Sequence, residues 1–283
     1  MVKIITDSTN DLGKEILDKL GVLVLPLSVN FSNASYLDGE NITTEELYKI
    51  VDEVNELPKT AAVPVQTFID TFTNNVSSGD EIVFTGISKA MSRTYENALM
   101  AAKEVAPDKI FVVDSMNLST GIGLLVLKAC KYRDNGDSAS EISSKLNRDN
   151  KLVLSQFAID TMEYLHKGGR CSSVAAIAGS ILRIKPIIAV RDGKMHVQKK
   201  PIGKMKFALD QMIKQIISDR DRLDTDHILI THSLAYESEK YIRNILESEF
   251  PNVDIISTVA GCVISSHCGR GTIGILYMVK PEK

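Results

Sequence analysis

Apolar runs alternate with polar loops and helix-like segments through the first half of the chain. Three runs, at 3–5, 82–84 and 109–114, have the β-branched and aromatic content of strands. Each leads into a polar loop rich in Ser, Thr, Asn and Asp, and then into apolar residues at helical spacing. Repeated strand, loop and helix predict a parallel sheet with helices on both faces. The three polar loops should meet at its carboxyl edge, where such sheets bind ligands.

Smaller signals complete this half. Residues 22–29 predict one further strand. Thr43 is one of two neighbouring threonines that can cap the next helix, with Glu46 available for a capping box. Residues 59–64 are expected to be an extended loop, because Pro64 biases the residue before it away from helical geometry.

The second half is richer in strands. Runs at 184–190 and 195–199 flank an Asp-Gly pair that is typical of a β-hairpin, so we expect a mixed or antiparallel sheet. A helix from residue 160 should end at the glycines 168 and 169. The next segment, VAAIAGSIL at 174–182, is apolar nearly all round, which predicts a helix that is buried or lines an apolar cavity.

These patterns predict an α/β protein of two domains. Residues 1–150 would form an N-terminal α/β domain with a parallel sheet, and residues 151–283 a C-terminal α+β domain. The 283 residues suffice for two domains of ordinary size.

Composition narrows the class of function. The net charge of −3 offers no basic footprint for nucleic acid. No apolar stretch approaches the roughly 20 residues that span a bilayer, and the first residues lack the pattern of a signal peptide. We therefore expect a cytoplasmic protein without stable membrane insertion. The four cysteines are scattered, and none forms a CxxC pair, so neither a disulfide framework nor a bound metal is expected.

The segment 81–102 carries the most suggestive local chemistry, because its strand ends in hydroxyls just where a helix begins. Ser92 or Thr94 can cap that helix. The first N–H groups of a helix lack partners and its dipole is positive there, so an anion is favoured at the same place. The segment alone leaves open whether the hydroxyls only cap the helix or also bind a carboxylate or phosphate.

Several short motifs match known functional patterns, but the residues around them do not fit those functions. The run 269–274 matches the dinucleotide pattern GxGxxG, but a strand-like segment follows it where a helix is needed. Gly86-Ile87-Ser88 resembles a nucleophile elbow without its second glycine. A serine hydrolase or acyltransferase using Ser92, with His267 as the base, remains the alternative function, although no orienting acid stands at a recognisable place.

Eight blocks, in this order along the chain, resemble the DegV family. They are DSTND at Asp7, YLDGENIT at Tyr36, KTAAVP at Lys59, ISKAMSRTYENA at Ile87, DSMNLSTGIG at Asp114, DTMEYLHKGGR at Asp160, IKPII at Ile184 and SHCGRGTIG at Ser266. The resemblance implies a two-domain α/β protein that holds a long-chain fatty acid between its domains. It further implies a binding subunit of a bacterial fatty acid kinase, which presents the carboxylate to a separate kinase subunit and carries the acyl phosphate away, with no catalysis or cofactor of its own.

The resemblance also implies a head-group site. Thr60 and Ser92 fall where the family's carboxylate-binding hydroxyls lie, and Arg170 and His267 match the basic positions nearby. The chain departs from the family pattern at two further cations, with Arg93 where glycine is usual and Arg270 where proline is usual.

The residues themselves leave simpler roles open. Arg170 can hydrogen-bond carbonyls at the end of the preceding helix, and His267 can be a satisfied interior histidine. The physical requirements of a fatty acid nevertheless agree with the resemblance. The acyl chain needs an apolar tunnel, where each buried CH₂ contributes about 0.8 kcal/mol, and the carboxylate needs convergent donors. Small residues such as Ala175, Ala176, Ala178 and Gly179 would leave room for the chain.

Overall fold

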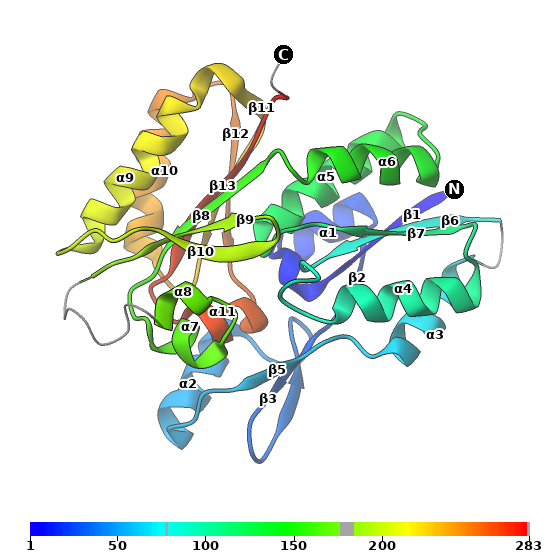
Figure 1. Cartoon of the computed structure of the whole chain (residues 1–283), viewed down its shortest axis with the longest axis horizontal. Coiled ribbons are helices and arrows are strands. Elements are labelled where there is room, and N and C mark those ends of the chain that lie inside the picture. The colour runs from blue at the N-terminus through cyan, green and yellow to red at the C-terminus, as the bar shows by residue number, and fades with distance from the viewer. Residues whose placement is uncertain (77–78, 176–183, 282–283) are drawn as a thin grey trace.

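The N-terminal half forms a four-stranded parallel sheet. The computed structural model of the chain describes residues 1–76, 79–175 and 184–281 (Figure 1). The strand order is β2-β1-β6-β7 and every neighbouring pair is parallel, as predicted. The strands are β1 (Val2–Asp7), β2 (Leu23–Leu25), β6 (Glu81–Gly86) and β7 (Ile110–Asp114).

Helices cover both faces of this sheet, because consecutive strand residues point in opposite directions. Ile4 of β1 packs with Ile122 of α5, whereas Ile5 packs on the opposite face with Phe68 of α3, and all are fully buried. The helices of this half are α1 (Lys14–Leu20), α2 (Thr44–Val54), α3 (Val65–Val76), α4 (Thr94–Val105), α5 (Thr120–Asp134) and α6 (Ala139–Asp149). Their arrangement confirms the doubly covered sheet.

The C-terminal sheet has six strands in the order β10-β9-β8-β13-β11-β12. Only β11 and β12 are parallel and the other pairs are antiparallel, so the sheet is mixed, as predicted. The strands are β8 (Val153–Ala158), β9 (Ile187–Arg191), β10 (Lys194–Lys199), β11 (Leu223–His232), β12 (Asp254–Val259) and β13 (Ile273–Val279). The predicted hairpin joins β9 to β10, with positive φ at both Asp192 and Gly193.

One helix lies between the two large sheets. α5 contacts β1 and β6 of the first sheet and β8, β11 and β13 of the second (Figure 1). On the outer face of the second sheet lie α9 (Met205–Ser218) and α10 (Tyr236–Glu249). No helix in the described part of the chain is long and apolar enough to cross a membrane.

The prediction of one strand over 22–29 is wrong. The chain forms β2, then leaves the first sheet at Pro26 and forms β3 (Ser28–Asn30) in a third, small sheet with order β4-β3-β5. Proline has no N–H to donate to a sheet, which explains the break. The expected loop at 59–64 is also partly wrong, because β5 (Lys59–Ala61) pairs with β3; β4 is Ser35–Leu37.

The remaining helices are short. Gly169, with φ of +70°, follows α7 (Glu163–Gly168), as its glycines predicted. The segment predicted to line an apolar cavity begins as α8 (Ser172–Ala175), and residues 176–183 lie outside the described residues. The helix α11 (Cys262–Cys268), of seven largely buried residues, was not predicted from the sequence.

Candidate functional site

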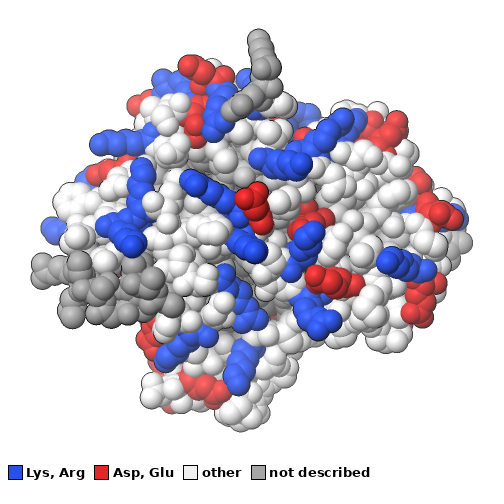
Figure 2. Space-filling view, in the orientation of Figure 1, with Lys and Arg blue, Asp and Glu red and all other residues white. Residues whose placement is uncertain are grey.

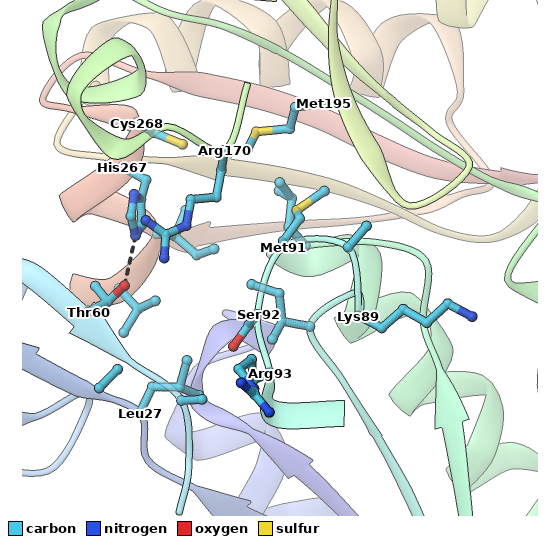
Figure 3. A pocket seen from close by; sticks show the side chains of 17 residues that line it. Leu27, Thr60, Lys89, Met91, Ser92, Arg93, Arg170, Met195, His267 and Cys268 are labelled. Carbon is cyan, nitrogen blue, oxygen red and sulfur yellow. Dashed lines mark hydrogen bonds between the residues drawn. The ribbon is translucent and has the colours of Figure 1, made fainter. Parts of the chain in front are cut away.

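A cavity of about 420 Å³ opens where the small sheet, the loop after β6, α11 and the β9–β10 hairpin meet (Figure 3). Most of its lining is apolar: Leu27, Ala61, Ala62, Ile87, Ala90, Met91, Leu118, Met195, Val263, Ile264 and Cys268. The polar lining consists of Thr60, Lys89, Ser92, Arg93, Arg170 and His267. The four predicted site residues are all among them, although the chain separates them widely.

A hydrogen bond joins the side chains of Thr60 and His267. Thr60 Oγ1, on β5, lies 2.8 Å from His267 Nε2, on α11. Burial and the nearby positive charge of Arg170 lower the pKa of His267 to about 4. The imidazole is therefore neutral near pH 7 and offers hydrogen bonds rather than a charge.

The other ring nitrogen of His267 faces the end of α7. His267 Nδ1 is buried and has no hydrogen-bond partner among the described residues. A Cβ atom built on Gly168 would lie 2.5 Å from Nδ1. Only a residue without a side chain fits at position 168 while the imidazole keeps this place.

Ser92 ends a tight turn after β6. The N–H groups of Met91 and Ser92 donate to Ser88 O over 2.9 and 3.1 Å, which aims the Ser92 hydroxyl at the start of α4. Ser92 Oγ accepts from Thr94 N at 3.3 Å and lies 2.9 Å from Thr94 Oγ1. The prediction that Ser92 or Thr94 is the N-cap is wrong, because Arg93 occupies that position; the Ser92 hydroxyl still satisfies the first N–H.

Arg170 lies at the exposed side of the cavity. Its guanidinium donates to Gly168 O over 2.7 Å, so the simpler role considered for it, bonding a carbonyl at a helix end, is present in the structure. The same side chain lines the cavity beside His267 (Figure 3). Both functions are therefore available to one residue.

The two cations that depart from the family pattern lie in different places. Arg93 lines the cavity next to Ser92 (Figure 3). Arg270 does not line it, and instead stacks 4.9 Å from the centre of the Tyr48 ring and pairs with Asp52 at 3.6 Å. Of these two arginines, only Arg93 lines the cavity.

The residues that hold α11 in place were not predicted from the sequence. Asp11 Oδ1 accepts from Gly261 N at 2.9 Å, and Asp38 Oδ1 accepts from Cys262 N at 2.7 Å. Gly261 is the N-cap and has no side chain to do this itself. Both aspartates stand in the blocks DSTND and YLDGENIT, but nothing local indicates a partner more than 220 residues away.

Burial raises the pKa of both anchoring carboxyls, Asp11 and Asp38. Asp11 Oδ2 also accepts from Ser119 Oγ over 2.6 Å. Buried carboxylates are costly unless hydrogen-bonded, and these bonds place the first turn of α11 firmly. Through α11 they support four lining residues of the cavity: Val263, Ile264, His267 and Cys268.

The arrangement of Ser92 and His267 does not favour the alternative function, a serine hydrolase. His267 Nε2 faces Thr60 and the Ser92 hydroxyl faces Thr94, so the two are engaged elsewhere. No Asp or Glu appears among the described residues of the cavity lining, and a catalytic histidine needs an orienting group. Ser88, of the elbow-like motif, is fully buried and donates to Gly193 O over 2.9 Å. Over the described residues, no three His, Cys, Asp or Glu side chains gather as a metal would require.

Comparison with known proteins agrees with this architecture. A model of the DegV family matches residues 1–280. A DegV domain-containing protein of Clostridium acetobutylicum is 34% identical over 282 residues, 99% of each chain. Two solved structures cover 98–99% of this chain and 99% of their own. One, of a DegV family protein from Thermus thermophilus described as fatty acid binding, has a TM-score of 0.91 at 29% identity.

The other is a stearic acid-binding protein from Eubacterium ventriosum, with a TM-score of 0.87 at 28% identity. A family match over nearly the whole length, together with a relative above 30% identity and the same fold, leaves one assignment. The chain belongs to the DegV family.

Proposed function

We propose that this protein binds one long-chain fatty acid, with the carboxylate at Thr60, Ser92, Arg170 and His267. The observation that carries the proposal is an apolar cavity with hydroxyls, an imidazole and a guanidinium on its wall. Its volume falls within the roughly 300–1,000 Å³ of small-molecule sites. Relatives of the same fold that are described as binding fatty acids support it.

The two parts of the ligand would be recognised in different ways. Each CH₂ buried against the apolar lining contributes about 0.8 kcal/mol, so the acyl chain supplies most of the affinity. The carboxylate would exchange water for hydrogen bonds from Thr60 and Ser92, with His267 holding the Thr60 hydroxyl and Arg170 as the countercharge. The cavity has lining residues from both 1–150 and 151–283, the two domains that we propose.

We further propose that the protein carries its ligand to a separate kinase in the cytoplasm. The kinase would transfer the terminal phosphoryl group of a nucleoside triphosphate to a carboxylate oxygen, and the acyl phosphate would leave on this carrier. The support is chemical. No Asp or Glu of the described lining could hold the Mg²⁺ that phosphoryl transfer uses, and the proposal assigns that part to the second protein.

The first test is direct. Organic extraction of the purified, denatured protein followed by mass spectrometry should give a stoichiometric fatty acid, and the stripped protein should bind one on titration. An empty extract together with no binding on titration refutes the proposal.

The head-group site is tested by substitution. Ser92→Ala should weaken fatty acid binding about tenfold or more without unfolding the protein, since one hydrogen bond to a charged group is worth about 1.5–3 kcal/mol. The control is Ser144→Ala, on the exposed face of α6. Unchanged affinity of Ser92→Ala would remove Ser92 from the site. Ester hydrolysis that disappears with the same substitution would favour the enzyme instead.

A further inference from the structure

Positive charge is in excess at the cavity. Three cations line it, Lys89, Arg93 and Arg170, and no acidic side chain does so among the described residues. The positive charge of Arg170 helps to lower the pKa of His267 on the cavity wall, and so helps to keep the imidazole neutral. Figure 2 shows Lys and Arg side chains gathered across the middle of the face viewed in Figure 1. A single carboxylate needs one countercharge, so two cations remain.

The three cations differ in what already engages them. Arg170 bonds Gly168 O, and Lys89 lies 3.8 Å from Asp114. Arg93 makes no ion pair with any described residue, although Glu96 stands three positions on in the first turn of the same helix. Of the three cations, Arg93 is therefore the one least engaged by other groups of the protein.

The position of Arg93 suits an anion larger than a carboxylate. Arg93 is the N-cap of α4, a helix of 12 residues, directly after Ser92. At this end the helix dipole is positive. In Figure 3 the Arg93 side chain lies beside that of Ser92. A guanidinium presents paired N–H groups that match phosphate oxygens, which a carboxylate bound by Ser92 would leave unused.

We propose that Arg93 is a specificity-determining residue, which favours an acyl ligand with a dianionic phosphate head group over the free fatty acid. The inference rests on the proposed function, because it concerns the same cavity and the same acyl chain. The carboxylate is held by the four residues named above, and Arg93 adds a contact that only the phosphorylated ligand reaches. The carrier would thus hold the phosphorylated ligand more tightly than the free fatty acid.

The experiment compares two ligands of equal chain length. Palmitate and hexadecyl phosphate are titrated at about pH 8, where a phosphate monoester carries nearly two negative charges. The proteins are the unaltered chain, Arg93→Gly, Arg93→Lys and a control, Lys103→Gln, which removes one exposed charge from the far end of the same helix. Glycine is well tolerated at an N-cap, so Arg93→Gly should fold normally.

We expect Arg93→Gly to lose about tenfold in affinity for hexadecyl phosphate and to change less than about twofold for palmitate. Arg93→Lys should recover part of the loss, since it keeps the charge but not the paired donors. Lys103→Gln should leave both affinities unchanged. Added salt should shrink the difference between the ligands.

Two outcomes overturn the assignment of Arg93. One is an unchanged affinity of Arg93→Gly for hexadecyl phosphate while palmitate still binds. The other is an equal loss for both ligands, which would make Arg93 a general attractant. Failure of the unaltered chain to bind either ligand is distinguishable from both, and would overturn the proposed function together with this inference.

Discussion

The bond between Asp38 and the start of α11 gives the sharpest test of how this site is built. Asp38 is 3% exposed, and its Oδ1 accepts from the buried Cys262 N–H at 2.7 Å. Asp38→Ala removes the acceptor and leaves that N–H unpaired, which costs about 1–3 kcal/mol of the free energy of unfolding.

Asp38→Asn separates the hydrogen bond from the charge. The amide oxygen can still accept from Cys262 N, and burial, which raises the pKa of Asp38, no longer penalises a charged form. We therefore expect the free energy of unfolding of Asp38→Asn to be within about 1 kcal/mol of that of the unaltered chain, and clearly higher than that of Asp38→Ala. Urea unfolding with an unchanged m-value measures the difference.

The same substitution should reach the cavity. Since α11 carries Val263, Ile264 and His267 to its wall, a loosened first turn weakens fatty acid binding although Asp38 does not line the cavity. Asp38→Asn should restore the affinity that Asp38→Ala loses. Asp18→Ala, on the exposed surface of α1, is the control. Equal stability of the Ala and Asn variants, or full affinity in Asp38→Ala, would refute this reasoning.

Two further predictions concern His267. Gly168→Ala should abolish most fatty acid binding, because the new Cβ would lie 2.5 Å from His267 Nδ1. The control, Gly169→Ala, meets nothing within 4 Å and should cost only about 1 kcal/mol of stability for its φ of +70°. Calorimetric titration measures the affinities and urea unfolding the stabilities, and similar affinities of the two variants would contradict the prediction. The pKa of His267, 6.5 unfolded and about 4 folded, means that stability is lost as pH falls from about 6.5 to 4, by up to about 3 kcal/mol. His267→Gln should lose less stability over this pH range. Burial raises the pKa of Asp7 to about 6, so Asp7 adds stability as pH falls, but it does so in both proteins and cancels in the comparison. Parallel pH profiles would refute this.

The sequence predicted the large sheets well because their signals are local. Apolar runs, polar loops and the Asp-Gly pair at 192–193 mark strands and a hairpin whose geometry nearby residues decide. The strand predicted over 22–29 failed for two reasons. Pro26 breaks it locally, and β3 belongs to a different sheet because β4 and β5 pair with it, which propensity alone cannot show.

The site divides in the same way. Family resemblance placed Thr60, Ser92, Arg170 and His267 at one cavity, and the structure brings all four to its wall. Their supports were not predictable. The anchoring bonds of α11 join residues more than 220 positions apart, and the closeness of Gly168 to His267 exists only once α7 and α11 pack together.

The short connections of the small sheet determine what the Thr60–His267 bond can report. Only Pro26 and Leu27 join this sheet to β2, and three residues join β5 to α3, so Thr60 must follow any movement of the N-terminal sheet. His267 follows α11, which stands between β12 and β13 of the other sheet. Because Asp11 and Asp38 of the N-terminal half also hold the start of α11, a rotation of one sheet against the other would strain this 2.8 Å bond together with those two bonds. The imidazole NMR signals of His267 would then report movement between the two sheets.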